Sequence, residues 1–267
     1  MNDPMSAPTV TAATVFCGVC GDQHAAEITC PRCERVGKLR DEAAIRTVEE
    51  RSPLRVAVGL FALLAIVHIG FIGVLTAVSG EKDAAREVAV DWWLSGVDAA
   101  IIVAFVVIAR RVMLPLLATI GRWWWYPIGA VSGAFTMAVA SVAVNAMESV
   151  FGASGSSYSD AFLAAGHSWF AVVVSIAVMP AVFEELAFRG VIQSHLSLLV
   201  PTAAAIGMTA ALFTLLHFNM LSFPHLLVMG LVVGLIRRFS GSIYPGVVLH
   251  FVHNGLVVAM EWRELSS

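Results

Sequence analysis

Charged residues are scarce in this sequence: 13% of its 267 residues are Asp, Glu, Lys or Arg, whereas 58% are hydrophobic. Soluble domains usually carry about a quarter charged residues. The deficit is too large for the core of a soluble protein, so the lipid bilayer must be the solvent for most of the chain. The formal net charge of −3 is small and points to no nucleic-acid partner.

The sequence also lacks a signal-peptide pattern and an internal repeat. Residues 1 to 16 contain no basic stretch followed by an apolar run and a small-residue cleavage site. We therefore expect the first long apolar run, which starts at Leu54, to act both as the targeting signal and as the first span.

Cysteine is absent from the membrane part, because all four cysteines precede it: Cys17, Cys20, Cys30 and Cys33. They form two CxxC pairs with nine residues between them. Four thiolates suit tetrahedral Zn²⁺, with bonds of about 2.3 Å. Redox dithiols or disulfides are the alternative, which a cytoplasmic location disfavours. We predict a structural zinc-ribbon-like head that, with a charged linker, occupies residues 1–52 and is a candidate for binding a protein partner.

Long apolar runs make up the remainder of the chain and predict an all-α polytopic membrane protein with about seven transmembrane helices. Residues 53–160 hold the N-terminal helices, and residues 161–262 form a second, C-terminal region. The stretch 189–200 is too short and too polar to span a bilayer, so we expect an interfacial helix there. The expected spans are 54–78, 92–109, 124–150, 161–183, 202–219, 222–239 and 243–260.

The basic residues between the spans predict the orientation. With seven spans, the head falls on the same side as Arg189 and as the residues from Arg110 to Arg122, Arg237 and Arg238. Cytoplasmic loops carry an excess of Lys and Arg. We therefore expect a cytoplasmic N-terminus in what is, from the chain's compactness, a bacterial cytoplasmic membrane.

Three charged residues follow the apolar run that ends near residue 183: Glu184, Glu185 and Arg189. Glu185 and Arg189 are four residues apart, so the two side chains can pair on one face of a helix. A simple explanation is the cytoplasmic end of a helix, with the arginine side chain extending to the interface.

Other polar residues within the spans favour a functional site. His217 ends the fifth apolar run, and His250 and Asn254 lie four residues apart in the last one. Such groups are difficult to place against lipid and should face a protein interior or a wet cavity. One carboxylate, two imidazoles and an amide from three spans therefore predict a site.

These groups suit the activation of water. A carboxylate in a cavity can act as a general base, a histidine beside it can hold the attacking water, and an imidazole and an amide can donate to a developing oxyanion. A catalytic zinc bound by one carboxylate and two histidines is the nearest alternative. The HExxH motif of zinc proteases is absent, which weakens that alternative.

The order of the motifs resembles a known family. Glu184-Glu185-x-x-x-Arg189, then Phe213-x-x-x-His217, then His250-x-x-x-Asn254 are similar to the three motifs of the CAAX-protease and bacteriocin-processing (CPBP) family of intramembrane glutamic endopeptidases. The resemblance covers about residues 160–260.

The resemblance implies that Glu184 and His217 activate water and that His250 and Asn254 form the oxyanion site. Glu185 and Arg189 would then support Glu184. It also implies that catalysis requires no metal and that the substrate is a membrane-associated peptide or protein. The other histidines match no motif position and are expected to pack: His68, His167, His195, His225 and His253.

Two alternatives remain at this stage. The first is a non-catalytic membrane scaffold or sensor that binds a partner through its zinc head. The second is a transporter in which Glu184 and His217 relay protons, although the chain lacks the two matching halves that such a fold uses.

Overall fold

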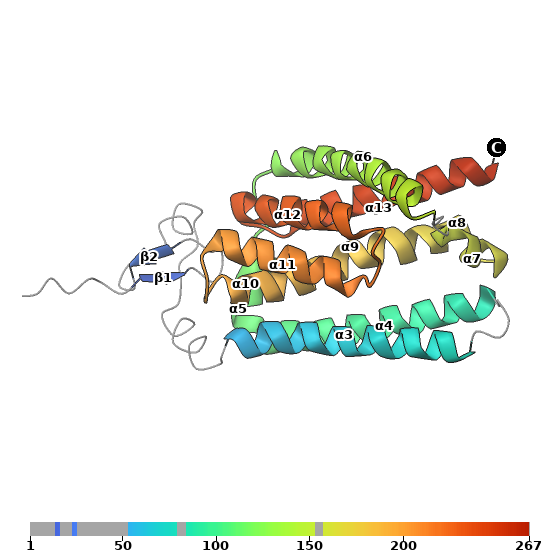
Figure 1. Ribbon diagram of the computed structural model, residues 1–267. Coiled ribbons are helices and arrows are strands. Elements are labelled where there is room, and N and C mark those ends of the chain that lie inside the picture. The colour runs from blue at the N-terminus through green and yellow to red at the C-terminus, as the bar shows by residue number, and fades with distance from the viewer. Residues whose placement is uncertain (1–13, 17–22, 26–52, 79–83, 153–156, 267) are drawn as a thin grey trace, which may run out of the picture.

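The computed structural model describes residues 14–16, 23–25, 53–78, 84–152 and 157–266 (Figure 1). In the head, strands β1 (Thr14–Phe16) and β2 (Gln23–Ala25) pair antiparallel. All four cysteines lie outside the described residues, so the zinc site stays a prediction.

From residue 53 the described chain is helical. Its N-terminal half contains α3 (Pro53–Val78), α4 (Ala84–Ile108), α5 (Arg110–Leu117), α6 (Trp125–Phe151) and α7 (Tyr158–Ala164). One continuous helical stretch then comprises α8 (Trp169–Val172), η1 (Val173–Val178), α9 (Met179–Glu184), η2 (Glu185–Ile192) and α10 (Gln193–Leu196). The last three are α11 (Thr202–Leu216), α12 (Phe223–Ser240) and α13 (Tyr244–Ser266).

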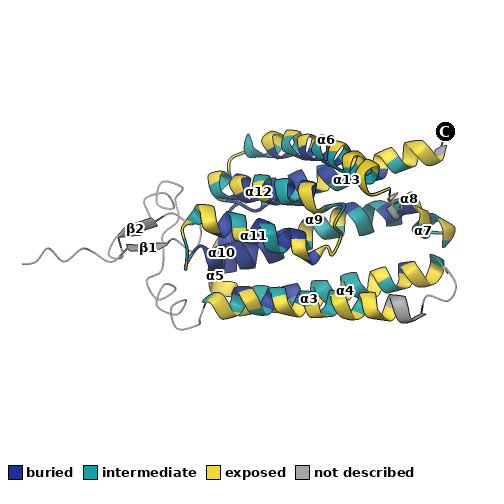
Figure 2. Cartoon of the chain, in the orientation of Figure 1, coloured by how far each residue is buried: buried dark blue, intermediate teal, exposed yellow. Residues whose placement is uncertain are grey.

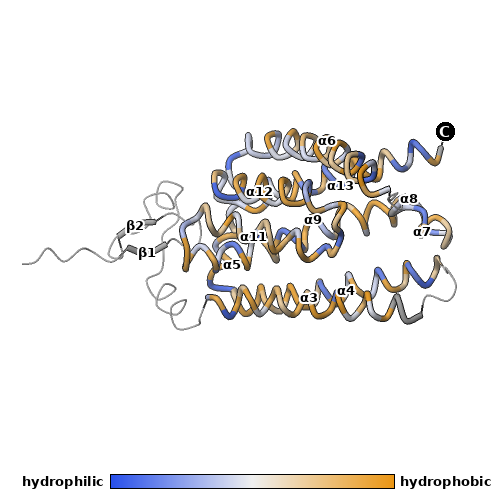
Figure 3. Tube along the Cα trace, viewed as in Figure 1, coloured by the Kyte–Doolittle hydropathy of each residue, from blue (hydrophilic) through white to orange (hydrophobic). Residues whose placement is uncertain are grey.

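Five helices within the described residues are long and apolar enough to cross a bilayer: 53–74, 84–108, 125–151, 169–196 and 223–240. Their outer faces are exposed and hydrophobic (Figures 2 and 3), as lipid-facing surfaces must be. Helix α11 is apolar but has only 15 residues, and α13 has 23 residues but carries His250, His253 and Asn254. The chain is an integral membrane protein, and the count of seven spans stays a prediction.

The region around residues 161–200 differs from the sequence prediction. The fourth span runs from Trp169 to Leu196 rather than over 161–183, because α7 forms a separate short helix before it. The expected interfacial helix at 189–200 is wrong: Arg189, Gln193 and His195 are buried within the bundle. A polar segment can continue a span here because protein, not lipid, surrounds it.

Close helix packing depends on two GxxxG pairs, Gly129 with Gly133 on α6 and Gly230 with Gly234 on α12. On α6, a Cβ atom at Gly129 or Gly133 would lie 2.4 Å from the carbonyl oxygen of Pro245 or 2.5 Å from that of Leu249. On α12, a Cβ at Gly230 would lie 2.9 Å from the Cβ of Ala210 on α11. Small residues let helix backbones approach closely in membranes. These contacts fix α13 and α12 beside the polar centre of the bundle.

The span 169–196 lies inside the bundle, between the α3–α4 pair and the group formed by α6, α12 and α13 (Figure 1). The core of the bundle gathers around its second half, where Ala187, Phe188, Val191 and Ile192 are buried. The two glutamates therefore sit in mid-span, in the interior, rather than at the end of a helix.

Candidate active site

The helix that carries the two glutamates is not a regular α-helix. It contains two π-helical segments, η1 and η2, on either side of the short α9 segment that includes Pro180 and ends at Glu184. Proline lacks the N–H group that an α-helix needs, and π-helical turns are frequent at functional sites. The irregular winding sets the directions of Glu184 and Glu185, which are adjacent in sequence.

Glu185 forms a fully buried ion pair. Its Oε1 atom lies 2.9 Å from Nη1 of Arg189, and both side chains are completely inaccessible. Nη2 of Arg189 also donates to the carbonyl oxygen of Gly230 on α12, at 3.3 Å. A buried charge is tolerated only when it is paired and hydrogen-bonded. The pair therefore joins this helix to α12, and the explanation of Arg189 as a residue that extends to the interface is wrong.

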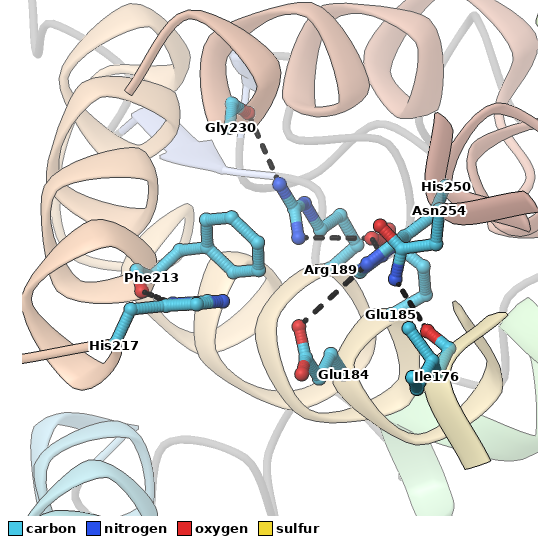
Figure 4. Close-up of polar contacts among 9 residues, drawn as sticks. All are labelled: Ile176, Glu184, Glu185, Arg189, Phe213, His217, Gly230, His250 and Asn254. Atoms are coloured by element: carbon cyan, nitrogen blue, oxygen red, sulfur yellow. Dashed lines mark hydrogen bonds and ion pairs between the residues drawn. The ribbon is translucent and has the colours of Figure 1, made fainter. Parts of the chain in front are cut away.

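His250 lies between the two glutamates (Figure 4). Its Nδ1 atom is 3.1 Å from Oε1 of Glu185, and its Nε2 atom is 3.8 Å from Oε2 of Glu184. The first distance is a hydrogen bond, whereas the second is an ion-pair distance that is too long for a hydrogen bond. Glu184 differs from its buried neighbour because its side chain is 30% exposed.

Phe213 connects α11 to the cluster formed by Arg189 and His250. Its ring lies 4.7 Å from the guanidinium carbon of Arg189 and in edge contact with His217 and His250, at centroid distances of 4.8 and 6.0 Å. The Nδ1 atom of His217 donates to the carbonyl oxygen of Phe213 at 2.9 Å. A neutral His217 then carries its lone pair on Nε2, and the ring extends from α11 toward the side that carries Glu184 (Figure 4).

Asn254 lies one turn after His250 on α13. Its side-chain Nδ2 donates to the carbonyl oxygen of Ile176 at 2.9 Å (Figure 4). An amide nitrogen has two hydrogens, so one donor remains for another acceptor. The structure thus brings five of the six predicted residues into a chain of contacts, with Asn254 attached to the same irregular helix.

A cavity of about 80 Å³ opens beside Glu184. It is lined mainly by apolar side chains of α3, α4, α9, η2 and α11, among them Ile102, Phe183 and Phe188. Such a space can hold water, and an apolar wall with a few polar groups is typical of ligand sites. Within the described residues, no three His, Cys, Asp or Glu side chains are grouped to hold a metal ion.

Three further polar residues that belong to no motif line the cavity: His68 on α3, and Ser95 and Asp98 on α4. His68 was expected to pack, and Asp98 was not considered. The sequence contained a signal for Asp98. It is an acidic residue within an apolar span, and such residues usually have a specific role.

The family comparison agrees with this region of the chain. Residues 166–256 match the family model described as Type II CAAX prenyl endopeptidase Rce1-like. This region belongs to the CPBP family. The predicted resemblance is confirmed. Membership of this family implies that the protein is a membrane protease, without specifying its catalytic type.

The match has clear limits along the chain. It contains Glu184, His217, His250 and Asn254 but excludes the head, α3, α4 and α6. Neither the curated proteins nor the solved structures contain a significant match. The roles of the residues in this CPBP region therefore rest on their own geometry.

Proposed function

We propose that the protein is an intramembrane endopeptidase that hydrolyses a peptide bond of a membrane-associated protein or peptide with water activated by Glu184. The proposal rests on the different environments of two adjacent carboxylates, those of Glu184 and Glu185. Glu185 is sealed and paired, whereas Glu184 is part-exposed at a cavity and faces an imidazole at 3.8 Å. A general base needs this combination of fixed position and access to water.

Glu184 takes a proton from the water as the oxygen attacks the scissile carbonyl carbon. His217 is proposed to hold the same water through Nε2, since its Nδ1 already donates to Phe213. An exposed imidazole at the end of α11 can accept a hydrogen bond from water without moving the helix.

His250 and Asn254 are proposed to stabilise the oxyanion that forms in this step. A protonated His250 donates Nδ1–H to Glu185, and its Nε2–H then points toward Glu184, 3.8 Å away. The second hydrogen of the Asn254 amide is a further donor from the same helix. Fixed donors of this kind usually change kcat by about 10²–10³-fold each.

Glu185 and Arg189 are positioning residues in this proposal. Glu185 holds Nδ1 of His250 and so directs Nε2 to the reacting atoms, in the way that a buried carboxylate orients a catalytic imidazole. Arg189 holds Glu185 in place through its 2.9 Å contact.

The substrate class follows from the cavity and from the bilayer around it. An apolar wall on α3, α4 and α9 suits a peptide that carries hydrophobic side chains or a lipid group. The matched family is described by its action on prenyl CAAX proteins. A membrane-associated peptide is the proposal for this chain, and a prenyl group is one substrate feature to be tested.

The first experiment compares membrane-protein fragments in cells that express the wild type, Glu184→Gln or Glu87→Gln. The first substitution removes the base with little change of shape, and Glu87 is an exposed glutamate on α4 that serves as the matched control. We expect a set of new termini that is present with the wild type and the control and lost with Glu184→Gln.

Identical fragment patterns for all three proteins, at equal abundance, would contradict the proposal. The non-catalytic scaffold would then be the better explanation, and it predicts that Cys17→Ser abolishes the cellular effect while Glu184→Gln keeps it.

A further inference from the structure

His68 and Asp98 form a polar pair on the two helices that precede the matched region. Nε2 of His68 lies 3.5 Å from Oδ2 of Asp98, and the two side chains are 22% and 19% exposed. Both line the same cavity as Glu184. The α3–α4 wall therefore brings a second acid–base group to the proposed reaction site.

The 3.5 Å separation of Nε2 and Oδ2 is an ion-pair distance, and the hydrogen bond on the other ring nitrogen favours a proton between them. Nδ1 of His68 lies 2.9 Å from the carbonyl oxygen of Leu64, which can only accept, so Nδ1 must be the donor. Nε2 then contacts Asp98 favourably in two ways only. Either the imidazole is protonated and Asp98 is a carboxylate, or Asp98 carries the proton and donates it to a neutral imidazole.

A purely structural link between α3 and α4 would be the simpler explanation. Against it, the Oδ1 atom of Asp98 is buried and has no hydrogen-bond donor among the described residues. A link that only holds helices together gains little from leaving a buried acceptor unused, because that costs about 1–3 kcal/mol. A buried oxygen left without a partner beside a cavity is typical of a group that is kept for function rather than for stability.

We propose that the His68–Asp98 pair supplies the proton that the leaving amine requires, an inference that rests on the proposed function. The water oxygen bonds to the scissile carbon, and Glu184 accepts one proton of that water. The C–N bond then breaks, and its electron pair takes the proton held by the pair. The proton on Glu184 returns to the pair through cavity water, so the net reaction adds one water across the peptide bond.

The proposed base and the proposed acid lie on different helices around the cavity. Glu184 belongs to α9, whereas His68 and Asp98 belong to α3 and α4, which line another side of the same cavity. A substrate bound between these helices meets a base on one side and an acid on the other. An amide nitrogen is a poor leaving group until it is protonated, and positioned acids and bases usually contribute about 10²–10⁴-fold.

The test uses purified full-length protein and two quenched peptides that carry an S-farnesyl cysteine. One peptide has an amide at the scissile position and the other a thioester, whose thiolate leaves without a proton. We expect His68→Gln and Asp98→Asn to lower kcat for the amide by about 10²-fold and for the thioester far less. The amide-to-thioester ratio does not depend on the fraction of folded protein, so misfolding cannot imitate the result.

Asp91→Asn is the matched control, because Asp91 is an exposed aspartate on the same helix that does not line the cavity. Its ratio should equal that of the wild type. If Glu184→Gln loses both activities while His68→Gln and Asp98→Asn behave like Asp91→Asn, the proton-donor role is wrong and the proposed function stands. If Glu184→Gln remains active on the amide, the proposed function fails and this inference fails with it.

A measurement without substrate tests the shared proton directly. In ¹⁵N-histidine spectra of the protein in micelles, the signals missing from His68→Gln identify His68. We expect Nε2 to show a shared or bound proton that is lost in Asp98→Ala. A neutral ring whose Nε2 has neither a proton nor a hydrogen bond from a donor, with the same ¹⁵N shift in Asp98→Ala, would overturn the inference even if neither peptide is cleaved.

Discussion

Asn254 on α13 donates its side-chain amide to the carbonyl oxygen of Ile176, at 2.9 Å. In a regular α-helix that carbonyl would accept from the N–H of the fourth following residue, which here is Pro180 and has no N–H. Asn254 therefore supplies a donor to this carbonyl from another helix, where Pro180 can supply none. The same contact fixes α13 against the helix that carries Glu184, so Asn254 has a structural role that is separable from the proposed catalytic one.

The relationship between Asn254 and Pro180 predicts a compensation. Asn254→Ala should lower the free energy of unfolding by about 1–3 kcal/mol, because it removes the side-chain donor to the Ile176 carbonyl. In a Pro180→Ala background the cost should be smaller, since alanine restores the backbone N–H that proline lacks. Unfolding in mixed micelles, followed by circular dichroism, measures both. Additive effects of the two substitutions would contradict the assignment.

Peptide cleavage separates the two roles of Asn254. If the amide also stabilises the oxyanion, Asn254→Ala should still reduce kcat by about 10²-fold when Pro180→Ala has restored stability. Recovery of full activity together with stability would reduce Asn254 to its structural contact.

The Glu185–Arg189 ion pair predicts strong non-additivity. Arg189→Met removes the only charged partner that the described structure gives Glu185 apart from His250, and it should cost about 3–5 kcal/mol. The double variant Glu185→Leu with Arg189→Met should recover much of this stability, because no buried charge remains, while cleavage stays low since His250 has lost its orienting carboxylate. A double-mutant cycle in the same unfolding assay measures the coupling, and additive losses would contradict it.

Gly246 tests how tightly Glu185 is held. A Cβ atom at Gly246 would lie 3.0 Å from Cγ1 of Val233 and 3.2 Å from Oε2 of Glu185. Gly246→Ala should therefore displace the carboxylate, destabilise the fold by about 1–3 kcal/mol and reduce cleavage. Gly255→Ala on the same helix is the control, because nothing lies within 4 Å of its added methyl group. Equal activity of the two variants would show that Glu185 tolerates displacement.

The predicted zinc head gives a prediction about metal removal. Purified protein should contain one Zn²⁺ per chain by elemental analysis, and Cys17→Ser or Cys30→Ser should lose it. Peptide cleavage should continue after chelation, because a closed four-cysteine site offers no open position for substrate. Loss of cleavage in proportion to zinc would place the metal in the reaction instead.

Much of this protein follows from its sequence. A bilayer excludes charge and unpaired backbone, so the long apolar runs predict helical spans, and the helices at 53–78, 125–151 and 223–240 begin and end within a residue or two of the prediction. The three motifs also identify the CPBP region. Polar groups are costly within spans, so those that occur there usually serve a function.

The tertiary structure decided what the polar residues do to one another. Nothing in the spacing of Glu184 and Glu185 shows that one is sealed by Arg189 and Gly230 while the other faces a cavity, since this depends on how α12 packs against the π-helical turn. The burial of residues 189–196 was missed for the same reason: local polarity predicts exposure unless other helices cover the segment. His68 and Asp98 lie far from every motif in the chain, and only the packing of α3 and α4 against the helix that carries Glu184 brings them to the same cavity.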